Sequence, residues 1–341
     1  MRTIIQNNID LASFFAMVFR CVSFRCVSFR SLASLWLCLC LAGSSAALAA
    51  NPHPIAVVAT TSMLADAMQR IGGDRVAVTA LMGAGVDPHS YRQTRSDIVR
   101  MVRADLVVSH GLHLEAQLEP FLAQLVQRTP VAALAEQLDP AKLLHDEDYP
   151  ERHDPHVWMD PRLWADVVAA GAQTLSRLDP EGRPYYEANA DRYLAELDAL
   201  AADSGRMLAG VPPGKRVLVT AHDAFRYFGR AYGYEVVAIQ GISTESEASL
   251  NRIEQLVELV ASRGIGAIFV ESSVPQRNIQ ALIEGAAARG HEVRIGGELF
   301  SDAMGAPGTP EDTYIGMFRH NVSTIATALA GSAPPAQAPE N

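Results

Sequence analysis

The segment Arg183–Leu208, RPYYEANADRYLAELDALAADSGRML, decides how the rest of the chain is organised. Its bulky apolar residues recur at steps of three and four, which is the spacing of one face of an α-helix. At 1.5 Å per residue such a helix is roughly 39 Å long, enough to span two compact lobes. The segment therefore predicts one long rigid helix that joins two halves of the protein.

Short apolar runs alternate with helical patterns on both sides of this helix. Runs of about five to seven apolar residues bounded by Gly, Pro or Asp are typical of buried parallel strands. We expect strands at 54–60, 75–82, 105–109, 130–134, 215–221, 235–240, 267–271 and 292–295. We expect helices at 62–71, with Ser62 as its N-cap, and at 115–127, 161–178, 224–232, 247–263, 276–289 and 312–330. The alternation predicts an α/β fold of two lobes with mostly parallel sheets.

The N-terminal region has the pattern of a secretory signal peptide. Arg20, Arg25 and Arg30 precede an apolar run at 32–41, and Ala47-Leu48-Ala49 has the small residues that favour cleavage. The apolar run is too short to span a membrane. We therefore expect cleavage near Ala49 and a periplasmic mature chain without a membrane span. The expected regions are a signal peptide at 1–49, an N-terminal α/β lobe at 50–182, the linking helix at 183–210, a C-terminal α/β lobe at 211–330 and a disordered tail at 331–341.

The charge and cysteine content of the chain limit its partners and the residues that could bind a metal. Lys and Arg number 28 against 38 Asp and Glu, a net charge of −10, which disfavours nucleic acid as a partner. All four cysteines, Cys21, Cys26, Cys38 and Cys40, lie within residues 1–49. A mature chain that starts after Ala49 has neither disulfides nor thiolate ligands, so any metal site must use histidine and carboxylate. Met1 and Met17 both remain possible start residues.

Four short segments place a histidine or aspartate just beyond a predicted strand or just before a predicted helix. They are DPHSY at 87–91, HDPHVWMDP at 153–161, TAHDAF at 220–225 and GGELFSD at 296–302. Ligands of open α/β sheets bind beyond the carboxyl ends of the strands, so these segments are expected to meet across a cleft. Three imidazoles and one carboxylate suit zinc, whereas a bidentate carboxylate also allows five-coordinate manganese. The acids expected to orient the histidine rings are Asp87, Asp154, Asp160 and Asp223.

The same segments resemble, in order, four motifs of the TroA-like solute-binding proteins, which serve zinc and manganese ABC importers. The matching stretches are DPHSY followed by Thr94 and Asp97, then DPHVWMDP, AHDAFRYF and GELFSDAMG. The resemblance covers the mature chain and implies two α/β lobes joined by one long helix, with metal held in the cleft between them. It implies as metal ligands His89, His156, His222 and Asp302. It also implies that a monomeric carrier delivers the ion to an ABC permease in the inner membrane.

The third ligand position bears on which metal is carried. Manganese- and iron-selective relatives often have Glu there, whereas this chain has His222, which favours Zn²⁺. Many zinc-dedicated members have a long His-rich loop before the second motif, but here residues 145–153 are short and acidic. Zinc is therefore the expected bound and transported ion, with Mn²⁺ as the alternative.

Two other classes of function could use the same set of ligands. A periplasmic zinc hydrolase is disfavoured because four protein ligands leave no open position for water, and because H-E-x-x-H and G-x-S-x-G motifs are absent from the sequence. A metal-binding adhesin would use the same fold without transport. We expect no enzymatic activity. We expect His110 and His113 to pack near the cleft without ligating metal, and His145 and His153 to lie in a solvated loop.

Overall fold

The computed structural model describes residues 53–146 and 149–331. By its contacts the chain divides into Met1–Ala49 and Ala50–Asn341, and the architecture below is that of the second unit. The predicted signal peptide and, apart from Gly331, the predicted tail lie outside the described residues. Among the helices that are described, none combines the length and apolar character needed to cross a membrane.

The sheet nearer the N-terminus has four parallel strands in the order β2-β1-β3-β4. The strands are β1 (Ile55–Ala59), β2 (Val76–Ala80), β3 (Leu106–Ser109) and β4 (Val131–Ala133). Ala59 at the end of β1 pairs with Ala80 of β2 and with Val108 of β3. The carboxyl ends of these strands therefore lie at one edge, and the loops that follow them share that edge.

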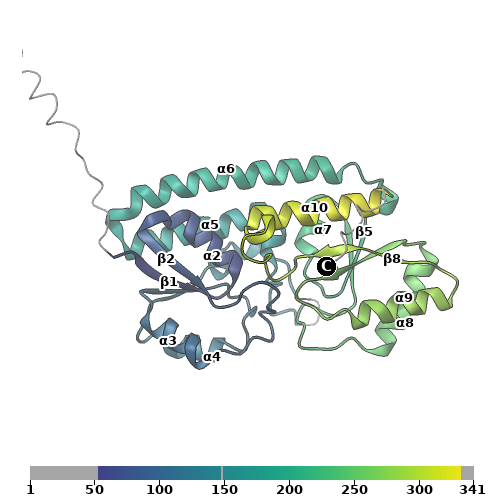
Figure 1. The fold of residues 1–341 in the computed structure, drawn as a ribbon, viewed down its shortest axis with the longest axis horizontal. Coiled ribbons are helices and arrows are strands. Elements are labelled where there is room, and N and C mark those ends of the chain that lie inside the picture. The colour runs from purple at the N-terminus through teal and green to yellow at the C-terminus, as the bar shows by residue number, and fades with distance from the viewer. Residues whose placement is uncertain (1–52, 147–148, 332–341) are drawn as a thin grey trace, which may run out of the picture. The chain divides into compact units, whose positions relative to one another are not determined.

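Helices cover both faces of this sheet (Figure 1). One face carries α2 (Ser62–Gly72), α5 (Pro161–Leu178) and α6 (Arg183–Leu208), and the other carries α3 (Arg95–Arg103) and α4 (Glu119–Leu125). Alternate strand residues point to opposite faces. Val57 accordingly packs in the core cluster that contains α2 and α5, whereas Val58 packs with Met101 of α3 and Leu122 of α4.

The second half is also built from parallel strands. β5 (Val217–Thr220) pairs with β6 (Glu235–Ala238), and β7 (Ala267–Glu271) pairs with β8 (Arg294–Leu299). β5 and β7 are in contact, and Glu271 at the end of β7 accepts a hydrogen bond from the amide of Ala221, just beyond β5, so their carboxyl ends lie together. The helices of this half are α7 (Arg226–Tyr232), α8 (Leu250–Ser262), α9 (Arg277–Ala288) and α10 (Tyr314–Ala330).

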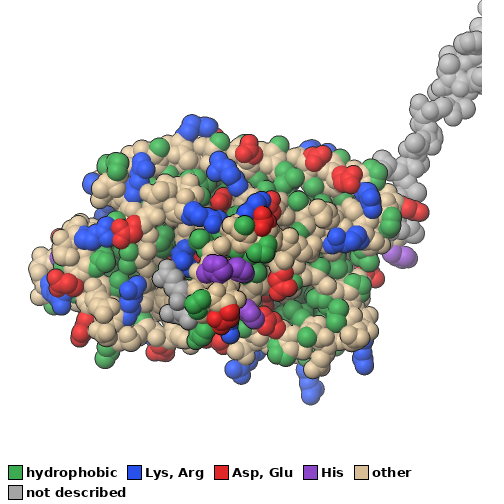
Figure 2. Space-filling model, turned by 180° about the vertical axis from the view of Figure 1, so that it is seen from behind, with side chains coloured by type: hydrophobic (Ala, Val, Ile, Leu, Met, Phe, Trp, Pro, Cys, Tyr) green, Lys and Arg blue, Asp and Glu red, His purple; other side chains and the backbone are tan. Residues whose placement is uncertain are grey.

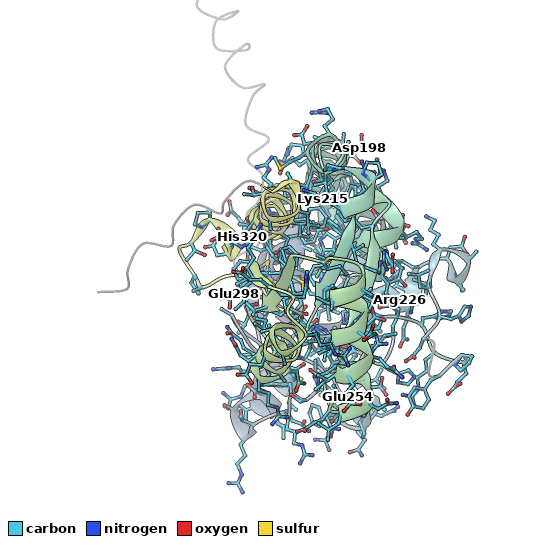
Figure 3. All side chains as sticks on the ribbon, turned by 90° about the vertical axis from the view of Figure 1, so that its right-hand side faces the viewer. Asp198, Lys215, Arg226, Glu254, Glu298 and His320 are labelled. Atoms are coloured by element: carbon cyan, nitrogen blue, oxygen red, sulfur yellow. The ribbon has the colours of Figure 1, made fainter. Side chains whose placement is uncertain are left out.

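The long helix α6 packs against α2 and α5 of the first half and against α10 of the second. In a side view, Asp198 on α6 and Glu254 on α8 lie at opposite ends of the molecule (Figure 3). One continuous apolar cluster includes Trp158, Leu197 and Phe318, which come from both halves and from α6 itself. The two-lobe α/β architecture with one long connecting helix is thus confirmed, and the shared core opposes a large hinge movement.

Several predicted elements differ in detail from the structure. Thr61, and not Ser62, caps α2, because its side chain accepts a hydrogen bond from the Leu64 amide. The helix predicted at 115–127 is the shorter α4, and the strand predicted at 292–295 is β8, which extends to Leu299. Helix α3 was not predicted, because its sequence RSDIVRMVR buries only Asp97 and Met101 and so lacks an apolar period. The predicted bounds of α5, α6 and β7 agree with the structure.

Candidate metal centre

The structure brings the four candidate ligands together. One potential ligand atom from each side chain lies within 4.8 Å of the others, and all four residues are buried. The ring atoms His89 Nε2 and His156 Nε2 are 3.3 Å apart, and His222 Nε2 lies 3.2 Å from Asp302 Oδ2. The other oxygen, Asp302 Oδ1, lies 3.5 Å from His156 Nε2. Across residues 53–146 and 149–331 this is the one group of His, Cys, Asp and Glu side chains so arranged.

His89 is positioned by the turn that follows β2. The Asp87 carboxylate accepts a hydrogen bond from the His89 amide through Oδ1 (2.9 Å) and another from the Ser90 hydroxyl through Oδ2 (2.7 Å). An aspartate that bonds the backbone two residues ahead fixes a tight turn. Asp87 therefore holds the loop that carries His89 and bonds its backbone, whereas the sequence predicted a bond to its ring.

His156 is anchored through both its backbone and its ring. Asp154 Oδ1 accepts hydrogen bonds from the His156 amide (3.0 Å) and from Nδ1 of its ring (2.8 Å). A proton on Nδ1 leaves the Nε2 lone pair facing the centre, which is the tautomer that metal binding requires. Asp154 therefore has the orienting role that the sequence predicted.

His222 follows β5 and is anchored by Glu271 at the end of β7. Glu271 Oε2 lies 2.5 Å from His222 Nδ1, and Glu271 Oε1 accepts from the amides of Ala221 (2.7 Å) and His222 (3.0 Å). This residue was missed as a partner. The available signal was an acid at the carboxyl end of a predicted fully buried strand, where a carboxylate needs a strong donor.

Two other predicted orienting acids have different roles. Asp160 caps α5 by accepting a hydrogen bond from the Arg162 amide (3.0 Å). Asp223 lies 3.8 Å from Arg226 Nε rather than on the ring of His222. Both predictions were wrong because adjacency in sequence does not determine the direction in which a side chain points after a strand.

Asp302 is held by a polar chain that connects the two halves. Ser273 Oγ donates to Asp302 Oδ2 (3.2 Å) and lies 2.8 Å from Ser301 Oγ. The Ser301 carbonyl accepts a hydrogen bond from the indole of Trp158 (2.7 Å), which lies two residues after His156. The aspartate of the second half is thereby fixed against a ligand of the first half.

The donors fit a divalent cation. His222 Nε2 and Asp302 Oδ1 are buried and have no hydrogen-bond partner among the described residues. Leaving buried polar atoms unpaired is costly unless another species satisfies them. Three imidazole nitrogens and a carboxylate are the donor types that bind zinc, and carboxylate oxygen also suits manganese.

Burial and nearby carboxylates give the three rings different proton affinities. Burial lowers the pKa of His89 to about 4. Burial also opposes charge on His156, but the hydrogen bond and negative charge of Asp154 raise the pKa of this ring to about 9. Burial acts the same way on His222, yet Asp302 and Glu271 hold its pKa well above the usual value. A metal ion therefore competes with protons at His156 and His222, whereas His89 is already neutral.

The remaining histidines near the cleft lie outside this group of four. His110 is buried against Trp158, its Nε2 lies 2.7 Å from the Pro155 carbonyl, and burial lowers its pKa to about 3. His113 is exposed and its Nδ1 lies 2.9 Å from Glu119. His145 and His153 form an isolated bridge between their backbones, with ring centres 4.9 Å apart.

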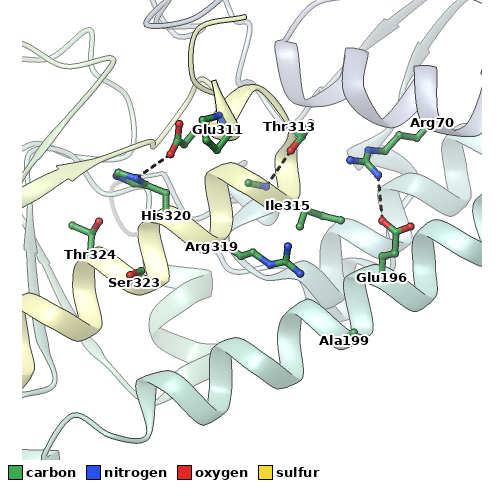
Figure 4. A pocket seen from close by; sticks show the side chains of 12 residues that line it. Arg70, Glu196, Ala199, Glu311, Thr313, Ile315, Arg319, His320, Ser323 and Thr324 are labelled. Carbon is green, nitrogen blue, oxygen red and sulfur yellow. Dashed lines mark hydrogen bonds and ion pairs between the residues drawn. The ribbon is translucent and has the colours of Figure 1, made fainter. Parts of the chain in front are cut away.

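A separate groove of about 870 Å³ lies between α6 and α10. Arg70 and Glu196 form an ion pair of 3.2 Å at one end of it, and His320 and Glu311 lie 3.5 Å apart at the other (Figure 4). Its charged groups pair with one another or face solvent and do not converge on a common point. The groove is therefore not the place where the predicted ligands meet.

Comparisons with known proteins agree with the motifs. The family model ZnuA, described as zinc-uptake complex component A, periplasmic, matches residues 57–328. The manganese-binding lipoprotein MntA of Bacillus subtilis is 44% identical over 287 residues, which cover 84% of this chain and 94% of that protein. The zinc-binding protein TroA of Treponema pallidum is 45% identical over 282 residues, which cover 83% and 91%. The solved structure of that periplasmic zinc-binding TroA superposes with a TM-score of 0.79 at 44% identity, covering 82% of this chain and 100% of that one.

Proposed function

Because this chain belongs to the ZnuA family of zinc-uptake components, we propose that it captures a divalent transition metal, Zn²⁺ first, and delivers it to an ABC permease. The observation that carries the proposal is the meeting of four buried donors, two of which have unpartnered atoms facing the centre. The metal is cargo here, bound and then released. His89, His156, His222 and Asp302 are the proposed ligands.

Zinc is proposed before manganese on the basis of the donor set. Three imidazoles and one carboxylate complete a tetrahedral shell, which is the geometry zinc prefers. The names of the relatives do not decide the metal, since one at 44% identity is called manganese-binding and one at 45% zinc-binding. One observation supports manganese as the second candidate. Both oxygens of Asp302 face histidine nitrogens of the centre, so a bidentate, five-coordinate site is within reach.

Release follows from where the ligands are located. His89 and His156 come from the first half, whereas His222 and Asp302 come from the second. A small separation of the halves lengthens several metal–ligand distances at once, so a modest movement suffices to weaken binding. The core shared by both halves limits the movement to that scale. Four protein donors also complete the shell without water, which supports carriage rather than catalysis.

The cellular setting is part of the proposal. The pattern ending at Ala49 supports export and cleavage, which would place the mature chain in the periplasm. We propose that it works there as a monomer with a permease in the inner membrane. Family membership supports the permease as partner.

The direct test is titration of the metal-free protein with Zn²⁺ and with Mn²⁺ in competition with a chelator. We expect one ion per chain and tighter binding of Zn²⁺. Co²⁺ in the same site should give the visible absorption of a four-coordinate ion. Absence of tight binding of either metal would overturn the proposed function, and tighter binding of Mn²⁺ would replace zinc by the second candidate.

A further inference from the structure

Four exposed arginines without ion-pair partners lie in or just before α3 and just beyond the end of α4. They are Arg92, Arg95, Arg103 and Arg128. Among the described residues, the side chains of these four arginines have no hydrogen-bond or ion-pair partner. Several other exposed arginines of the chain are paired with acids, as in Arg206–Asp203, Arg263–Glu235, Arg277–Glu247 and Arg289–Glu258, although Arg183 and Arg319 also lack a partner among the described residues. In a protein of net charge −10, a local excess of unpaired positive charge is the exception. We call these four residues the arginine face.

Helix geometry places Arg95 and Arg103 on one surface, and Arg128 lies near the end of the same helix. Arg95, Val99 and Arg103 are spaced four apart on α3 and therefore share one side of the helix. Met101 points to the other side, into the core cluster shared with α4. The Thr129 hydroxyl lies 3.4 Å from the Val102 carbonyl, which brings the neighbouring Arg128 to the end of α3. Lys and Arg side chains project from the lower margin of the molecule in the view from behind (Figure 2).

Apolar side chains are interleaved with the arginines. Val99, Val102 and Val126 are 47%, 42% and 50% exposed, which is high for aliphatic residues. Interfaces between proteins are enriched in arginine and place apolar contacts among polar ones. A purely electrostatic surface would not need these valines. The combination suits a protein partner with acidic side chains and some apolar surface.

Hydrogen bonds connect helix α3, which carries part of the arginine face, to the segment of the metal ligand His89. Helix α3 begins with a capping box in which Thr94 and Asp97 bond each other's backbone. The Tyr91 hydroxyl donates to the same carboxylate, Asp97 Oδ2 (2.7 Å), and Tyr91 lies two residues after His89. A partner that binds α3 therefore also restrains the segment that carries His89.

We propose that the arginine face docks onto an acidic surface of the permease, so that the transporter grips the segment of His89. This inference rests on the proposed function, since it names the surface by which the carrier meets its transporter. Charge complementarity selects an acidic occupant. The connection to His89 selects the permease over a membrane surface, because the hand-off needs a contact that reaches the ligands.

The test is a matched pair of double charge reversals. R95E/R103E inverts the arginine face, and R183E/R319E makes the same charge change at exposed arginines of α6 and α10 that also lack a partner among the described residues. Zinc affinity of each variant is measured first by chelator competition. Binding is then measured to the transporter's own permease and ATPase in phosphatidylcholine nanodiscs, and separately to phosphatidylglycerol vesicles.

We expect R95E/R103E to bind the permease at least about tenfold more weakly, with zinc affinity within about twofold of wild type. R183E/R319E should match wild type in both measurements, and wild-type docking should weaken as salt is added. If R95E/R103E is poorly folded, the milder R95Q/R103Q should show about threefold weaker docking.

Three results would overturn the inference. One is unchanged docking of the folded variant, another is an equal loss in both double variants, and the third is a loss confined to phosphatidylglycerol vesicles, which would assign the face to lipid. Failure of the wild-type protein to bind zinc or manganese is a separate result, and it would end the proposed function rather than the docking surface alone.

Discussion

Two kinds of histidine meet at the centre, and they differ in how their rings are held. His156 and His222 each have a carboxylate on Nδ1, Asp154 at 2.8 Å and Glu271 at 2.5 Å. The ring of His89 has no hydrogen bond to a carboxylate among the described residues, and Asp87 bonds only its backbone. The pKa of His156 is accordingly about 9, whereas burial lowers that of His89 to about 4. Anchored rings form the fixed part of the site, and His89 is the ligand whose movement costs least.

The largest effect should come from removal of an anchored ligand. His222→Ala deletes one of four donors and leaves Asp302 and Glu271 buried near an empty space. The binding free energy of a structural zinc site is about 10 to 16 kcal/mol for all its ligands together. One ligand of four accounts for about a quarter of it, so we expect zinc affinity to fall roughly 100- to 1000-fold. Competition titration measures the loss, and His113→Ala, an exposed histidine outside the group, is the control. Binding within twofold of wild type in His222→Ala would remove this residue from the site.

Loss of an anchor should cost less than loss of a ligand. Glu271→Gln weakens the orientation and basicity of the His222 ring, and partners of this kind contribute about 10- to 100-fold to metal affinity. Asp87→Asn acts on the turn that carries His89 and on the hydrogen bond that the Thr244 hydroxyl donates to Asp87 Oδ2 (2.6 Å), but on no hydrogen bond to a histidine ring, so we expect a loss of less than about tenfold. Titration of both variants checks the order. A larger loss in Asp87→Asn than in Glu271→Gln would reverse the comparison between anchored and mobile rings.

Lowering the pH should weaken zinc binding through the anchored rings of His156 and His222. The pKa of His156 is raised to about 9 and the pKa of His222 is held well above its usual value, so zinc must displace protons from these rings. Affinity is therefore greatest above about pH 9 and falls by up to tenfold per pH unit for each displaced proton as pH decreases. Calorimetry in buffers of different ionisation enthalpy counts the protons released. Constant affinity between pH 9 and 6 would show that neither ring is charged before zinc binds.

The identity of the third ligand should have the smallest effect on total affinity and a visible one on selectivity. His222→Glu replaces an imidazole by an oxygen donor, which favours manganese relative to zinc. We expect the ratio of zinc to manganese affinity to decrease about tenfold. Parallel titrations with both metals give the ratio, and an unaltered value would mean that this position does not select the metal.

The sequence predicted what local chemistry determines. Helix α5 was found because Asp160 and Pro161 mark its start, and α6 because its apolar residues are periodic over its length. Helix α3 was missed because its charged residues conceal any period. Glu271 was missed because it reaches His222 across 49 residues, through the contact between β5 and β7. Such a partner depends on which strands become neighbours, and spacing along the chain does not encode that.

The ligands of the metal centre could be predicted from the sequence, whereas the arginine face could not. The four candidate ligands each follow a strand or precede a helix within a distinctive motif, so each could be named from its own segment. The carboxylate that anchors His156 lies two residues away and was found in the same motif. The arginine face has no sequence motif. It is recognised only in the folded chain, where its arginines lie near one another without acidic side chains to pair with.

X-ray absorption of the zinc-loaded protein tests the central claim most directly, because it counts the atoms bound to the ion. We predict three imidazole nitrogens and one carboxylate oxygen at about 2.0 to 2.2 Å, and one imidazole fewer in His222→Ala. A wild-type spectrum with fewer than three imidazoles, or one that does not change on loss of His222, would contradict the account.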